Sequence, residues 1–162
     1  MRKTYRMARS MIAVLGVALA LGVAAAPAAA AAPQPVTIVS HVTFNPDGPN
    51  FGDFTATGAA VDSGLLCGSG TFVDTGIRFA GFQSDRGTVQ IQVVKEFSCG
   101  GSDKFVVKLQ IQANFDTGIE TFTWVVMGGT GDFAGLRGGG SGSTVPNLPI
   151  GNINTYMGFL IP

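Results

Sequence analysis

Regular alternation of apolar and polar residues restricts the fold of this chain more than any other feature. Between residues 88 and 115 apolar side chains recur at every second position, on both sides of a short polar connection at 98–103, and only Val94 and Val106 depart from this spacing. Successive side chains of a β-strand point to opposite faces, so this spacing predicts two strands joined by a hairpin. After residue 32, only the segment 132–136 is expected to form a helical turn.

Similar but weaker patterns recur along the chain, separated by turn-forming stretches such as Asn-Pro-Asp-Gly-Pro at 45–49. About eight strands are expected, at 36–44, 54–61, 70–78, 88–97, 104–115, 119–127, 140–145 and 152–161. Closing them into a cylinder would remove every exposed edge, and the interior would be filled by side chains or hold one small ligand. We therefore predict an all-β fold with a single eight-stranded antiparallel β-barrel; a β-sandwich is the alternative.

The first 32 residues have the pattern of a secretory signal peptide. A basic start is followed by an apolar run at 11–26 and then by Ala- and Pro-rich sequence. The sixteen residues of that run would span roughly 24 Å as a helix, which is short of a ~30 Å hydrocarbon core. Cleavage is expected between Ala30 and Ala32, leaving one secreted domain at 33–162.

Removal of residues 1–32 makes the chain acidic. Four of the ten basic residues leave with that segment, so six basic residues face ten acidic ones, a net charge of −4. The remaining Lys and Arg residues are scattered singly rather than clustered. Neither nucleic acid nor a membrane surface is therefore expected as a partner of the mature chain.

Cys67 and Cys99 are the only cysteines, and both lie in the exported part. An oxidising compartment favours their pairing, and a bridge between them would stabilise the fold by roughly 3–4 kcal/mol. The alternative is a reactive thiol, which would need a nearby base or a Cys-x-x-Cys spacing. The sequence contains neither motif, since its single histidine, His41, is distant along the chain.

A glycine-rich segment, 128–140, follows the strand at 119–127. Its structural glycines are expected to form a tight corner and to restart a bent strand: Gly128, Gly129, Gly131, Gly135 and Gly138. Phe133 and Leu136 would then lie on one helical turn and plug one end of the barrel. A dinucleotide-binding loop is excluded because the later glycines would break the helix that such a loop requires.

This segment, Gly-Gly-Thr-Gly-Asp-Phe-Ala-Gly-Leu-Arg-Gly-Gly-Gly, resembles the connection between two late strands of allene oxide cyclases and dirigent proteins. It is still more similar to small secreted bacterial proteins with an allene-oxide-cyclase-like barrel. The order of features agrees over roughly 35–162, and the resemblance implies an eight-stranded antiparallel barrel. The cyclases act on an epoxide fatty acid and dirigent proteins steer phenol coupling. Outside this segment their catalytic residues are not matched position by position onto this chain, so the resemblance carries over neither activity.

Three residues on expected apolar faces are candidates for binding a ligand: Lys95, Glu120 and Trp124. If they point inward, the two charged residues would form an ion pair or contact a bound molecule. Alternatively, their long side chains reach solvent at strand ends, and Trp124 packs in the core. Sequence patterns of zinc sites and serine hydrolases are missing, so we expect no metal and no cofactor.

These observations leave three functions open. The first is a non-catalytic secreted barrel that binds a small apolar molecule or another protein. The second is a cofactor-free isomerase or cyclase that works inside the barrel. The third is a structural or association module of the cell surface. An interior packed solid by Phe side chains would end both the ligand and the isomerase hypotheses, and concentration-dependent self-association would support the third.

The disulfide assignment predicts the outcome of a thiol assay. Because both cysteines are expected to be bridged, the secreted protein should show no free thiol under denaturing, non-reducing conditions. Titration with a thiol reagent measures this directly, and two reactive thiols per chain would refute the bridge.

Overall fold

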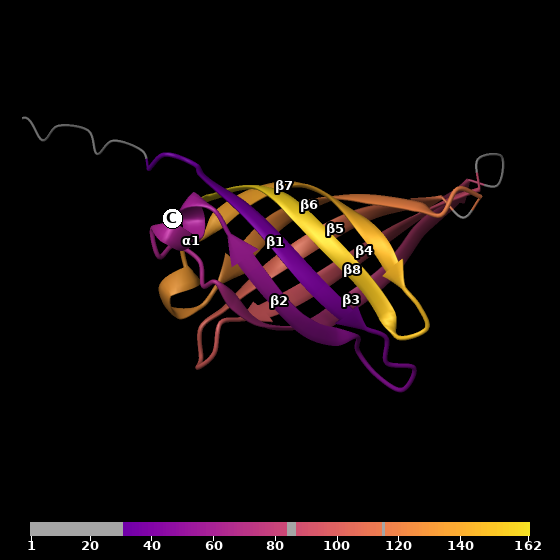
Figure 1. Cartoon of the computed structure of the whole chain (residues 1–162), viewed down its shortest axis with the longest axis horizontal. Coiled ribbons are helices and arrows are strands. Elements are labelled where there is room, and N and C mark those ends of the chain that lie inside the picture. Colours follow the sequence, from indigo (N-terminus) through magenta and orange to yellow (C-terminus); the bar gives the residue numbers. More distant parts are fainter. Residues whose placement is uncertain (1–30, 84–86, 115) are drawn as a thin grey trace, which may run out of the picture.

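The computed structural model describes residues 31–83, 87–114 and 116–162, so nearly all of the expected signal peptide lies outside the described residues. Each strand pairs antiparallel with its neighbours in sequence, and the last pairs with the first, which closes the sheet (Figure 1). The strands are β1 (Gln34–Thr43), β2 (Phe51–Thr57), β3 (Ser69–Gln83), β4 (Thr88–Ser98), β5 (Lys104–Asn114), β6 (Ile119–Gly129), β7 (Arg137–Asn147) and β8 (Gly151–Ile161). The predicted all-β, eight-stranded antiparallel barrel is confirmed, and the sandwich alternative is wrong.

Aromatic side chains fill the end of the barrel at which β4 ends and β5 begins, which we call the closed end. Phe97 lies at their centre and is completely buried. Its ring stacks on Phe105 at 4.9 Å and meets the edge of Phe54 at 5.2 Å. Inward-facing positions of an eight-stranded barrel leave little more room than such side chains occupy. This half of the interior is therefore a packed core.

The glycine-rich segment closes the same end. It forms a short 3-10 helix, η2 (Gly131–Phe133), which carries the buried Phe133 to within 5.4 Å of the Phe105 ring. Leu136 is also buried. Gly131 begins η2 at φ +56°, a conformation that side chains with a Cβ rarely adopt. Of the other expected structural glycines, positive φ is found at Gly128 and Gly138.

One expected strand is shorter than its pattern indicates. The stretch 54–61 leaves the sheet at Thr57, and α1 (Ala59–Asp62) forms a single helical turn instead. Gly58 has φ +108°, which ends the strand and lets Ala60 turn inward until it is fully buried. The predicted disulfide is confirmed: Cys67 and Cys99 are bridged with their Cα atoms 5.8 Å apart, joining this connection to the end of β4.

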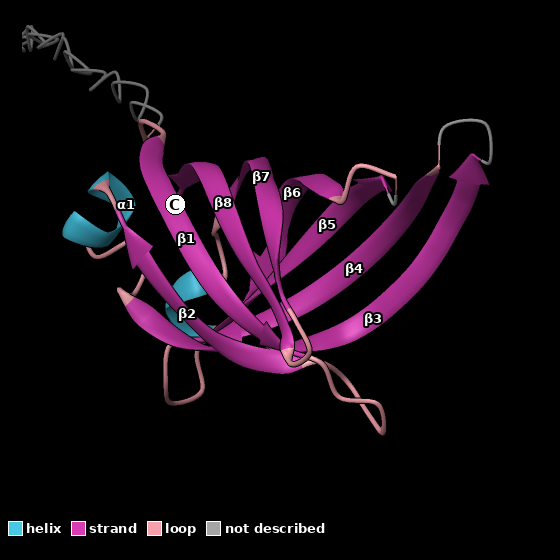
Figure 2. Ribbon diagram, turned by 45° about the vertical axis from the view of Figure 1, so that its right-hand side comes forward, coloured by secondary structure: helices cyan, strands magenta, loops and turns pink. Residues whose placement is uncertain are grey.

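The hairpin of β3 and β4 extends past the other strands at the opposite end of the barrel (Figure 2). Two register shifts interrupt this pair, between Asp74 and Gly76 and between Phe79 and Gly81. An extra residue in one strand reverses which side chains face inward beyond it. The first shift therefore sets Ile77 and Phe79 opposite the inward-facing residues of β4, at the mouth of the barrel. We call this end the open end.

Among the described residues, no helix has the length and apolar character needed to cross a membrane.

The packed core makes a stability prediction. Replacing Phe97 with Ala should lower the free energy of unfolding by about 3–5 kcal/mol, because the cavity cannot collapse between neighbouring rings. Phe159→Ala is the matched control: this side chain is 54% exposed, so its loss should cost less than about 1 kcal/mol. Chemical denaturation of both variants measures the difference. Equal decreases in the free energy of unfolding would contradict the assignment of Phe97 to the core.

Candidate functional site

Toward the open end, polar side chains join the apolar ones on the inward face of the sheet. These residues come from β1, β3, β4, β6, β7 and β8, and we call them the inner polar cluster: Ser40, Asp74, Lys95, Glu120, Thr144, Asn152, Asn154 and Tyr156. Burying polar groups in a small barrel costs free energy unless each finds a partner. The partners within this cluster therefore show which groups are satisfied and which are available to a ligand.

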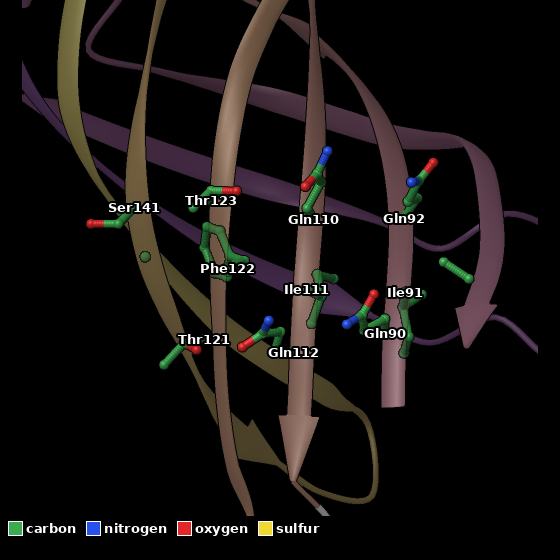
Figure 3. Close-up of a pocket in the computed structure, with 12 residues that line it drawn as sticks. Gln90, Ile91, Gln92, Gln110, Ile111, Gln112, Thr121, Phe122, Thr123 and Ser141 are labelled. Atoms are coloured by element: carbon green, nitrogen blue, oxygen red, sulfur yellow. The ribbon is translucent and has the colours of Figure 1, made fainter. Parts of the chain in front are cut away.

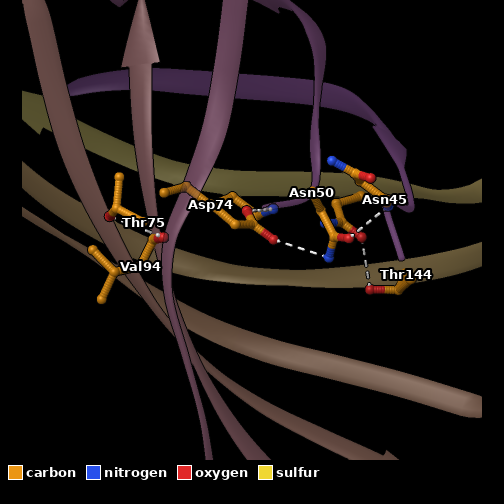
Figure 4. Close-up of polar contacts among 8 residues, drawn as sticks. Asn45, Asn50, Asp74, Thr75, Val94 and Thr144 are labelled. Carbon is orange, nitrogen blue, oxygen red and sulfur yellow. Dashed lines mark hydrogen bonds and ion pairs between the residues drawn. The ribbon is translucent and has the colours of Figure 1, made fainter. Parts of the chain in front are cut away.

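Asp74 and Lys95 form a buried ion pair at the centre of the cluster. They lie directly opposite each other on β3 and β4, both are 3% exposed, and Lys95 Nζ is 2.5 Å from Asp74 Oδ1. Asn50 Nδ2 donates a hydrogen bond to the other carboxylate oxygen at 3.2 Å (Figure 4). The ammonium also lies 4.4 Å from the centre of the Phe72 ring. Burial lowers the pKa of Lys95, while Asp74 and then Glu120 act to raise it.

Glu120 belongs to a second group of contacts on the neighbouring strands. The Thr144 hydroxyl oxygen lies 2.9 Å from Glu120 Oε1 and 2.9 Å from Asn154 Oδ1. A hydroxyl has one proton, so it donates to only one of these acceptors at a time. Glu120 therefore has unused capacity to accept hydrogen bonds, although its charge is close enough to act on Lys95.

Tyr156 lies beneath these groups and is 1% exposed. Neither its hydroxyl nor that of Ser40 makes a hydrogen bond of good geometry within the described residues. Burial raises the pKa of Tyr156 well above its usual range, and the nearby Ser40 and Asn154 offset only part of this shift. The phenol is therefore held neutral at ordinary pH.

A cavity of about 200 Å³ opens above the cluster. Its polar wall includes Asn50, Asp74, Lys95, Glu120, Asn152 and Asn154. Its rim contains three large apolar side chains that remain substantially exposed: Phe44 at 44%, Ile77 at 51% and Phe79 at 73%. An apolar rim above a polar base is the arrangement that suits an amphipathic molecule.

The structure brings two of the three expected binding residues together. Lys95 and Glu120 both line the cavity, but Lys95 pairs with Asp74 rather than with Glu120. Trp124 is outside the cavity lining, in the core, where its ring centre is 6.1 Å from that of Tyr156. Its indole N–H lies 3.3 Å from two backbone carbonyl oxygens, those of Ser141 and Met157. Thus Trp124 has the geometry of a core residue.

Sequence analysis missed Asp74, although a signal was present. The residue lies two positions after the apolar Phe72, so simple alternation already places both on one face of the strand. Alternation does not show which charged residue of the next strand faces Asp74. That pairing depends on the register of β3 against β4, which the alternation alone leaves open.

A second, larger hollow of about 530 Å³ lies on the outer face of the sheet (Figure 3). It crosses β3 to β7. Its lining includes the apolar residues Ala80, Ile91, Ile111 and Phe122 and uncharged polar side chains from alternate positions: Gln90, Gln92, Gln110, Gln112, Thr121, Thr123 and Ser141. Most of these side chains are exposed to solvent. The hollow therefore lacks the buried, charged groups that distinguish the inner cavity.

The other candidate chemistry is sparse in the described part of the chain. His41 lies on the outside of the barrel, with Nδ1 2.9 Å from Asp53 Oδ1. Within residues 31–83, 87–114 and 116–162, no three His, Cys, Asp or Glu side chains gather in a way that would hold a metal ion. A scan against protein-family models found no match, and a search of curated proteins found none.

The buried phenol predicts a pH response. A chain without residues 1–32 contains Tyr156 as its only tyrosine. The pKa of Tyr156 is higher in the folded protein than in the unfolded chain. As the pH rises past about 10, the unfolded chain therefore loses this proton first, and the free energy of unfolding decreases with further increase in pH. Phenolate absorbance should therefore appear only together with loss of near-ultraviolet circular dichroism. Ionisation near pH ~10 in a folded barrel would contradict the buried position.

Proposed function

We propose that this protein is a secreted, non-catalytic barrel that binds a small amphipathic molecule at its open end. The observation that carries this proposal is the cavity whose base is formed by buried polar groups and whose rim is exposed and apolar. A barrel whose interior is completely filled would need neither the buried polar groups nor the exposed apolar rim. The binding site would be the part of the barrel that its own side chains leave unfilled.

The apolar rim supports binding because it is costly to leave in water. Phe44, Ile77 and Phe79 could each be covered by the apolar part of a ligand, which would remove their surfaces from solvent. The backbone of Phe44 is fixed near them by its N–H, which donates to the carbonyl of Ile150 at 2.9 Å. At Phe44, the rim therefore combines a hydrogen-bonded backbone with an exposed apolar side chain.

The size of the cavity limits the ligand. A volume of about 200 Å³ is below the ~300–1,000 Å³ typical of sites for drug-sized molecules. The ligand would thus be a molecule of modest size, or the polar end of a longer amphiphile whose apolar chain lies along the exposed hairpin of β3 and β4. A binding function accounts for this geometry without any catalytic group.

Export is part of the same proposal. The signal-peptide pattern of residues 1–32 supports it, and the Cys67–Cys99 bridge is typical of proteins that fold in oxidising compartments. The resemblance of segment 128–140 to secreted allene-oxide-cyclase-like barrels points the same way. An exported barrel with an open cavity would meet small molecules outside the cell.

Binding of 1-octanol, a neutral amphiphile, tests the proposal. Calorimetric titration should show saturable binding, and Phe79→Gln should weaken it about tenfold by removing apolar surface from the rim. Phe159→Gln is the matched control, since Phe159 is 54% exposed but is absent from the cavity lining, and it should leave the affinity unchanged.

Absence of saturable binding would overturn the proposed function. An equal loss of affinity in both variants would do the same, because it would place octanol on the outer surface. Extraction of protein purified from the culture medium, followed by mass spectrometry, would identify any molecule that the barrel already carries.

A further inference from the structure

The charges around the cavity point to the chemistry of the ligand, and we propose that its polar end is a primary ammonium group. This inference rests on the proposed function and adds the class of ligand to it. The ammonium would lie against Glu120 and Asn152, and the apolar part would lie against Phe44, Ile77 and Phe79. All of these residues line the same cavity.

The first argument is the balance of charge. The cavity wall contains two carboxylates, Asp74 and Glu120, and a single ammonium, Lys95. Lys95 is already held by Asp74 and by the face of the Phe72 ring. The wall therefore carries one excess negative charge, and Glu120 is the carboxylate without a cationic partner within hydrogen-bonding distance among the described residues. Charges near a partly desolvated cavity interact more strongly than charges in water.

The second argument is the supply of hydrogen-bond acceptors. Glu120 shares the single Thr144 proton with Asn154, as described above. Asn152 Oδ1 is buried and has no hydrogen-bond partner within the described residues. An ammonium group offers three donors and needs no acceptor, so it complements these oxygens. A hydroxyl offers only one donor, and a carboxylate offers none.

A carboxylate ligand would meet the opposite situation. It would bring a third negative charge into a cavity whose one cation is already paired, and it would face oxygen atoms of Glu120 and Asn152. Unpaired like charges that lose water oppose binding strongly. The site should therefore select among amphiphiles of equal chain length by their polar group alone.

The test compares octylamine, 1-octanol and octanoate by calorimetric titration at pH 7 and fixed ionic strength. Octylamine should bind at least about tenfold more tightly than octanol, the difference expected for one charge-assisted hydrogen bond, and octanoate should bind most weakly. Glu120→Gln should abolish the preference for the amine while leaving octanol binding intact. Glu96→Gln is the matched control, because Glu96 pairs with Lys104 and is absent from the cavity lining.

A second variant keeps the inference testable if Glu120→Gln does not fold. Asn152→Asp adds a carboxylate at a half-buried position of the wall, so it should strengthen octylamine binding and weaken octanoate binding. Equal affinities for the three ligands, tighter binding of octanoate, or an amine preference that survives Glu120→Gln would overturn this inference. In those cases saturable octanol binding that depends on Phe79 would leave the proposed function standing. No binding of any of the three would overturn both.

Discussion

The pairing of β1 with β8 is the constraint on which the rest of the structure depends. These two strands join the ends of the described sheet over ten residue pairs, from Gln34 opposite Leu160 to Thr43 opposite Gly151. Once they are paired, every strand has two neighbours and all alternate side chains must share one interior. Both the aromatic core and the inner polar cluster follow from that closure, because inward-facing residues have no other place to go.

The side chains of the interior then differ between the two ends of the barrel. At the closed end, Phe97 and its neighbouring rings fill the available volume. At the open end, the Asp74–Lys95 pair occupies two buried positions. Apolar residues of similar size at these positions could make the folded protein equally stable or more stable. A buried pair of this kind is therefore poor evidence for stability and better evidence for a polar surface that has a use. Its place beside the cavity agrees with a binding role.

Local sequence predicted much of this arrangement. Alternation placed Lys95 and Glu120 on apolar strand faces, which the structure turns inward. The glycine-rich segment placed Phe133 and Leu136 on one turn, and in the structure the side chains of Phe133 and Leu136 are buried at the closed end. Alternation failed at the register shift after Asp74, since an inserted residue changes which face later side chains occupy without altering composition. It also failed at Gly58, where a positive φ ends a strand whose pattern continues.

By itself, the sequence determined the fold class, the number of strands and the disulfide, because strand formation and face selection depend on neighbouring residues and on their period. Tertiary structure alone decided which side chains meet. The partner of Lys95, the exclusion of Trp124 from the cavity and the cavity itself depend on the register between strands distant in sequence. Register is set by closure of the whole barrel and by the packing of its interior, which no short segment encodes.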